Sequence, residues 1–116
     1  MKKIFKKLAG LIVTLYANRI YAAVAKQADA AHQKTKERYY VISSMADISK
    51  LVIIDRNGFR EMKNATGAHT QTLANLMKGA WYYTADKLER GGLSASEREV
   101  RRLAFARHML ERAKLL

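Results

Sequence analysis

The sequence predicts an α+β fold in which a long N-terminal helix and a C-terminal helix flank a small antiparallel sheet. Three observations favour this class. Apolar residues recur at helical spacing over the first 33 residues, three short segments rich in aromatic and β-branched residues follow, and proline is absent from all 116 residues. With 49% hydrophobic residues, the chain can form one core but is too short for two ordinary domains. We therefore expect a single domain over residues 1–116.

The N-terminal helix is predicted to carry two apolar stripes. The first comprises Ile4, Leu8, Leu11 and Leu15, with Phe5 and Ile12 beside them, and the second comprises Val13, Ala17, Ile20, Val24, Ala28 and Ala31. Such a helix would run roughly 46 Å, whereas a compact chain of this size has a radius of gyration of about 13 Å. We therefore expect about residues 1–16 to protrude and one stripe to need a partner. The spacing leaves open which stripe is core.

Three strands are predicted at about residues 39–43, 50–55 and 80–84, with two short helices between the second and the third. The second strand lacks polar alternation, so we expect it to be central or covered on both faces. In the pairs Tyr39-Tyr40 and Tyr82-Tyr83, one ring should face inward and the other outward. The short helices are expected to begin after Asp55 or Asn57 and after Thr70 or Thr72, and to end near Gly67 and Gly79.

The C-terminal helix is predicted at about residues 94–114, because Ser94 and Glu97 form a capping box. Its expected core stripe comprises Val100, Leu103, Ala106, Leu110 and Ala113. The opposite side carries Arg98, Arg101, Arg102, His108 and Arg112, together with Phe105 and Met109. Phe105 and Met109 suit either an apolar wedge between phosphate contacts or the core itself.

Positive charge dominates the composition. The 22 Lys and Arg residues against 10 Asp and Glu residues give a net charge of +12, which favours nucleic acid, anionic lipid or an acidic protein as partner. The candidate nucleic-acid contacts are Arg98, Arg101, Arg102, His108, Arg112, Lys2, Lys3, Lys6 and Lys7. The candidate partner or membrane interface is Ile4, Phe5, Leu8, Leu11, Ile12 and Leu15, since the lysines of residues 2–16 lie opposite this stripe.

The sequence offers no catalytic signature. Without cysteine it can form neither disulfides nor thiolate metal sites, and its three histidines, His32, His69 and His108, have no ligand spacing. Its glycines form no phosphate-binding loop. We therefore expect no catalytic residue, cofactor, metal or small-molecule substrate. The apolar run after the lysines is short and is followed by Asn18 and Arg19, so we expect neither secretion nor a membrane-spanning helix, and a cytoplasmic location.

Four segments are distinctive: residues 1–10, the strands Tyr39-Tyr40-Val41-Ile42 and Leu51-Val52-Ile53-Ile54-Asp55-Arg56, and Arg101-Arg102-Leu103-Ala104-Phe105. In these segments the chain resembles a group of small basic proteins encoded by gut anaerobes and their tailed bacteriophages. The group has no established function to carry over to individual residues. The resemblance implies an accessory protein of a phage or mobile element, in the cytoplasm or in a virion.

Two functions of different class follow from these observations. The first is a non-catalytic structural or assembly protein, oligomeric or part of a larger assembly, that docks through its N-terminal helix and contacts nucleic acid through a basic surface. The second is a peripheral membrane protein anchored by the amphipathic N-terminal helix.

Overall fold

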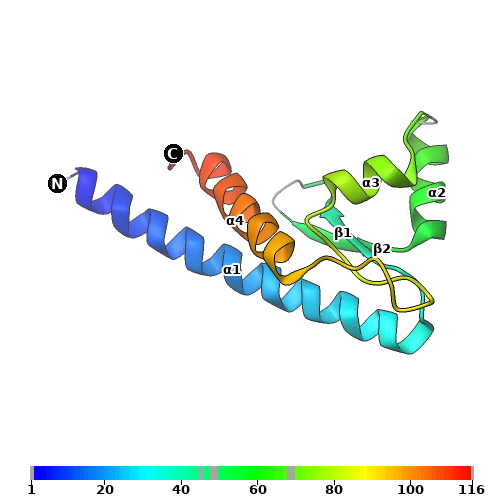
Figure 1. The fold of residues 1–116 in the computed structure, drawn as a ribbon. Helices are drawn as coiled ribbons and strands as arrows, with labels where there is room; N and C mark the ends of the chain where they lie inside the picture. The colour runs from blue at the N-terminus through cyan, green and yellow to red at the C-terminus, as the bar shows by residue number, and fades with distance from the viewer. Residues whose placement is uncertain (1, 45, 48–49, 68–69, 116) are drawn as a thin grey trace.

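A computed structural model describes residues 2–44, 46–47, 50–67 and 70–115, and it confirms the predicted α+β class (Figure 1). The helices are α1 (Lys2–Thr35), α2 (Arg56–Thr66), α3 (Leu73–Gly79) and α4 (Ala95–Arg112). The strands are β1 (Tyr40–Ser43), β2 (Leu51–Ile54) and β3 (Tyr82–Tyr83). The elements occur in the predicted order, and β3 is shorter than expected. The loop predicted between the first two strands lies partly outside the described residues, as does His69.

The sheet is antiparallel with strand order β2-β1-β3. Tyr40 pairs with Ile54 on one side and with Tyr83 on the other, so β1 is the central strand. The prediction that Leu51–Ile54 is central is therefore wrong, and Val52 is 37% exposed. Its alternative, cover on both faces, is confirmed in part: Leu51 and Ile53 are partly buried on the α1 side and Ile54 is partly buried on the α2–α3 side.

Helices cover both faces of the sheet, which corrects the expectation for the tyrosines. Tyr82 joins the cluster under α1, whereas Tyr40 and Tyr83 pack with Phe59 and Leu76 of α2 and α3. In each pair one ring is buried, Tyr40 or Tyr82, and its neighbour is only partly buried, so the expected alternation is present, but the second ring packs against the other helical layer. The molecule thus has three layers, with α1 and α4 on one face and α2 and α3 on the other.

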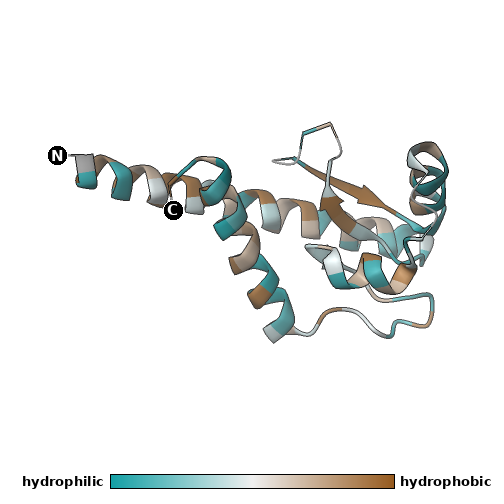
Figure 2. Cartoon of the chain, turned by 90° about the horizontal axis from the view of Figure 1, so that it is seen from above, coloured by the Kyte–Doolittle hydropathy of each residue, from teal (hydrophilic) through white to brown (hydrophobic). Residues whose placement is uncertain are grey.

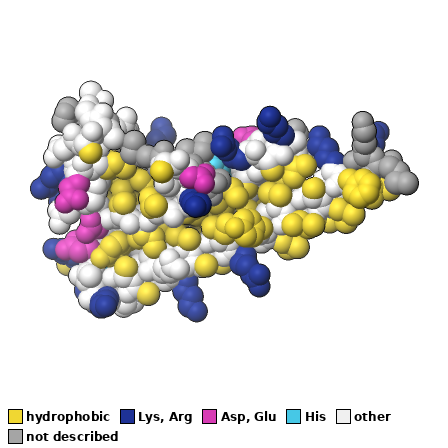
Figure 3. All heavy atoms as spheres, turned by 180° about the vertical axis from the view of Figure 1, so that it is seen from behind, with side chains coloured by type: hydrophobic (Ala, Val, Ile, Leu, Met, Phe, Trp, Pro, Cys, Tyr) yellow, Lys and Arg dark blue, Asp and Glu magenta, His cyan; other side chains and the backbone are white. Residues whose placement is uncertain are grey.

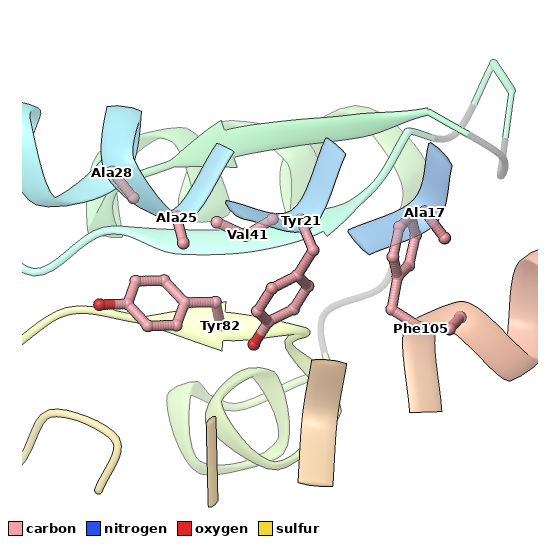
Figure 4. Packing of buried hydrophobic residues seen from close by; sticks show 8 residues of the cluster. Ala17, Tyr21, Ala25, Ala28, Val41, Tyr82 and Phe105 are labelled. Atoms are coloured by element: carbon pink, nitrogen blue, oxygen red, sulfur yellow. The ribbon is translucent and has the colours of Figure 1, made fainter. Parts of the chain in front are cut away.

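The inner side of α1 is formed by small residues and one tyrosine. Ala17, Tyr21, Ala25 and Ala28 are fully or almost fully buried (Figure 4). Only Ala17 and Ala28 belong to the second predicted stripe, whose other members are partly buried, so the core side of α1 is that stripe rotated toward Tyr21 and Ala25. Alanines allow α1 to approach the sheet and α4 closely. Tyr21 fills the space between them, and its hydroxyl donates a hydrogen bond to the Trp81 carbonyl at 2.6 Å. Burial raises the pKa of Tyr21 to about 12, so the hydroxyl remains a donor.

The expected core stripe of α4 is wrong for most of its members. Val100 is 66% exposed and Leu103 is 56% exposed, whereas Phe105 and Ala106 are buried. The Phe105 ring packs against Trp81 and Tyr21, with ring centroids 5.4 and 6.1 Å apart. A buried aromatic ring removes more apolar surface from water than an aliphatic side chain does. The α4 helix therefore turns its Phe105 side to the core.

Side-chain caps fix where the shorter helices and α4 begin. Asp55, Thr72 and Ser94 accept hydrogen bonds from the backbone N–H groups of Gly58, Asn75 and Glu97, as expected for N-caps. The α2 helix ends at Gly67, whose positive φ of 72° favours glycine. These local signals explain why the element boundaries were predictable.

Candidate functional site

The N-terminal half of α1 exposes a continuous set of large apolar side chains. We call this set the outer face of α1; it comprises Ile4, Phe5, Leu8, Leu11, Ile12, Leu15 and Tyr16. Each of these side chains is between 52% and 68% exposed. In the space-filling view, hydrophobic side chains form a band along the molecule, with Lys and Arg side chains standing out on both sides of it (Figure 3). The set contains every residue of the predicted interface and adds Tyr16.

The α1 helix reverses its apolar side midway along its length. At about 100° per residue, Leu8 and Leu15 lie about 120–140° around the helix from Tyr21. The apolar residues before position 17 therefore point away from the body of the protein, whereas the buried ones from Ala17 onward point into it. The N-terminal turns also extend past the end of α4 (Figures 1 and 2). The predicted protrusion and the exposed stripe thus belong to the same segment.

Basic residues surround the outer face without nearby acidic partners. No Asp or Glu occurs in the first 28 residues, which contain four lysines before position 8 as well as Arg19 and Lys26. Arg19 and Lys26 are exposed, and their positions on the helix place them on the same side as Leu8 and Leu15. No ion pair involves these two residues among the described part of the chain. The Lys2 side chain lies outside that part.

The predicted basic face of α4 does not form a free surface. Arg101 donates hydrogen bonds to the carbonyls of Met77 and Ala80 and lies over the Tyr83 ring. These contacts tie α4 to the end of α3.

The other members of that face are placed in a similar way. Arg102 pairs with Glu99 and donates to the Asn18 side chain at 2.6 Å, and Arg98 lies over the Tyr82 ring. The His108 ring packs on Trp81, with centroids 5.2 Å apart. Only Arg112 is fully at the surface among these five predicted contacts. Phosphate contacts by Arg98, Arg101 or Arg102 would therefore have to replace contacts within the fold.

His32 anchors the other end of α1. It is 3% exposed, its Nδ1 lies 2.7 Å from the Glu37 carbonyl, and its Nε2 lies 2.8 Å from Glu89 Oε1. With an acceptor at each ring nitrogen, the imidazolium is favoured. The hydrogen bond to Glu89 and then that to the Glu37 carbonyl raise the pKa of His32. The contact connects α1 to the loop before α4.

We expect the folded protein to lose stability as the pH rises above about 6.5 and through the raised pKa of His32, because a raised histidine pKa stabilises the fold fully below the unfolded value of about 6.5 and no longer above the folded value. The His32→Gln variant should lack this component. Thermal unfolding of both proteins across this range measures it. Parallel pH profiles for the two proteins would contradict the role given to His32.

The described residues were also compared with what a metal site and a membrane-spanning helix require. Within them, no group of three or more His, Cys, Asp or Glu side chains is placed to hold a metal ion. One helix there, α1, is long and apolar enough to cross a bilayer by length and composition, although a core helix can meet the same criteria.

The site residues that the sequence did not single out are Tyr16, Arg19 and Lys26. Tyr16 follows Ile12 at a spacing of four, so it could have been added to the stripe. Arg19 and Lys26 can be assigned to the same side of α1 as the outer face only once the core side of the helix is known. This chain matches no family model, no curated protein and no solved structure.

Proposed function

We propose that this is a non-catalytic peripheral membrane protein that lies on anionic lipid surfaces through the outer face of α1. The observation that carries the proposal is the set of seven apolar side chains, all more than half exposed, on the N-terminal half of a helix whose first turns extend past α4 and carry lysines on the other side. An interfacial helix buries such a side about 5–10 Å into the headgroup boundary and keeps its charges in water.

Charge favours a lipid surface over a second copy of the chain. Two outer faces brought together would also bring together two N-terminal segments that have basic residues and no acidic ones. The Ile4, Leu8, Leu11 and Leu15 pattern also covers only two heptads, fewer than a stable coiled coil usually needs. An anionic leaflet instead attracts each Lys or Arg near its surface by about 1 kcal/mol.

Binding along the surface fits the fold better than crossing the bilayer. A span of roughly 20 residues would have to include Arg19 and would have to remove Tyr21 and Ala25 from the core. An in-plane orientation leaves this core intact. It also places Arg19 and Lys26 at the headgroups, because they lie on the same side of α1 as the inserted residues.

Vesicle flotation tests the proposal. We expect the protein to float with vesicles of phosphatidylcholine and phosphatidylglycerol, and to bind phosphatidylcholine vesicles much more weakly. Raising the salt from about 0.05 to about 0.5 M should weaken binding without abolishing it, since salt screens the lysines and leaves apolar insertion intact. Equal binding to neutral and anionic vesicles, or no binding to either, would contradict the proposal.

The alternative function, an assembly protein that contacts nucleic acid, is tested in the same experiment. Its phage or mobile-element origin remains a prediction from the resemblance. If duplex DNA binds with a steep salt dependence while vesicles do not bind, the assembly function replaces the membrane one. Light scattering after size exclusion would then show whether the outer face joins copies of the chain.

A further inference from the structure

A second apolar surface lies between the N-terminal part of α1 and the end of α4. It is a groove of about 430 Å³, on the side of α1 opposite to the centre of the outer face. Its floor includes Gly10, Leu110 and Leu115, and its rim includes Lys3, Lys6 and Lys7. Leu11 lines the groove and also belongs to the outer face, but the other lining residues do not, so the proposed membrane contact of the outer face does not account for this groove.

Gly10 and the end of α4 together create the groove. A Cβ atom built at Gly10 would lie 3.9 Å from Leu110 Cδ2, an ordinary van der Waals contact, so Leu110 lies directly beside Gly10 and a side chain longer than alanine at position 10 would occupy the groove. Beyond α4 the chain turns back, because Lys114 has a positive φ of 58° and the Leu115 N–H donates to the Leu110 carbonyl at 2.9 Å. Leu110 and Leu115 therefore both line the apolar floor.

The charges of the groove have one sign. Among the described residues, three lysines and no acidic side chain line it, and none of the three forms an ion pair within that part of the chain. Cations above an apolar floor complement an anionic head joined to a hydrocarbon chain.

The size of the groove limits the occupant. The groove is open to solvent along its length, and its volume of about 430 Å³ falls in the range of small-ligand sites. The distance along α1 from Lys3 to Thr14 is about 16 Å, which is close to the length of an extended long-chain acyl group such as that of myristate. A single hydrocarbon chain fits both limits.

We propose that this groove binds a free long-chain carboxylate, with its hydrocarbon chain over Gly10, Leu110 and Leu115 and its carboxylate among the lysines. The occupant is a single molecule taken from solution, because the groove faces away from the side of α1 that would rest on lipid. The inference is independent of the proposed membrane binding.

Myristate, below its micelle-forming concentration, is the probe. Isothermal titration of the full chain should show one bound molecule, and methyl myristate, which lacks the charge, should bind at least about tenfold more weakly. The Gly10→Leu variant should also bind at least about tenfold more weakly, because each methylene that can no longer be buried lowers the affinity about fourfold. Leucine is a better helix former than glycine, so this variant should fold.

Two further variants, together with Gly10→Leu, separate the groove from the outer face. Replacing Lys3, Lys6 and Lys7 by glutamine should weaken myristate binding about tenfold or more. The Leu8→Asp, Ile12→Asp variant should bind myristate like the unaltered protein, since neither residue lines the groove. The Gly10→Leu variant should float with anionic vesicles as the unaltered protein does.

The proposal would be overturned if the ester bound as tightly as myristate, if Gly10→Leu left the affinity unchanged, or if no myristate bound. An unchanged affinity for myristate in the variant with Lys3, Lys6 and Lys7 replaced by glutamine would also overturn it. The lysines would then act only by favourable interaction with the backbone carbonyls at the C-terminus of α4. Loss of vesicle flotation with myristate binding retained would reject only the membrane function, and the reverse result would reject only the groove.

Discussion

Replacing Leu8 and Ile12 by aspartate should reduce binding to anionic vesicles at least about a hundredfold. Each substitution removes an apolar side chain that would enter the lipid and adds a charge that an anionic leaflet repels by about 1 kcal/mol, and about 1.4 kcal/mol corresponds to tenfold in affinity. Both side chains are more than half exposed in the fold, so the variant should remain folded. Vesicle flotation measures the loss, and circular dichroism checks the helix content.

The α4 helix provides a matched control. Val100 and Leu103 are 66% and 56% exposed, so their replacement by aspartate makes the same change in charge and apolar surface on a different helix. This control variant should retain most of its vesicle binding. If both double variants lost binding equally, net charge alone would explain attachment, and the outer face of α1 would have no specific role.

Replacing Phe105 by alanine should destabilise the fold by about 3–5 kcal/mol, the usual cost of removing a buried phenylalanine. Its side chain is 0% exposed and lies beside α1 (Figure 4). Its ring packs against the rings of Tyr21 and Trp81. For a domain of this size, such a loss lowers the melting temperature by more than about 10 °C. Thermal and urea-induced unfolding both measure the change.

Leu103→Ala is the comparison, because the sequence pattern places Leu103 in the core and the structure places it at the surface. It should change the stability by less than about 0.5 kcal/mol. Comparable losses for Phe105→Ala and Leu103→Ala would show that α4 is rotated relative to the orientation described above.

The sequence predicted the elements of this fold because their boundaries have local chemical causes. Asp55, Thr72 and Ser94 accept hydrogen bonds from backbone N–H groups in the first turns of α2, α3 and α4, and Gly67 takes the left-handed conformation at the end of α2. Each signal therefore acts within a few residues of its own position. Strand order was less predictable. The apolar run Leu51–Ile54 indicates burial on two faces, which an edge strand also has when helices cover both sides of the sheet.

The sides of the helices could not be predicted from spacing alone. In α4, the stripe with Val100 and Leu103 and the side with Phe105 have equally good helical periods, and the choice depends on Trp81 and Tyr21, which are distant in sequence. The side of α4 that faces the core also determines whether Arg101 and Arg102 are exposed or make contacts within the fold. Arg101 and Arg102 became internal contacts once Phe105 faced the core.

The candidate site was partly predictable. Its apolar members were evident as a stripe, because Ile4, Leu8, Leu11 and Leu15 repeat at helical spacing. The sequence could not show whether this stripe or the one through Ala17 faced the core. Nor could it show the groove, because Leu110 and Leu115 meet Gly10 only after α4 has packed across α1.

The α1 helix runs without a break from Lys2 to Thr35, so it rigidly connects the segment that would contact lipid to the folded body. No proline interrupts the helix, so a bilayer that fixes the tilt and roll of the first sixteen residues also sets the orientation of everything rigidly packed on the second half. The sheet lies on the opposite side of α1, with α2 and α3 beyond it. In an attached molecule, α2 and α3 would therefore lie farthest from the bilayer and face the aqueous phase.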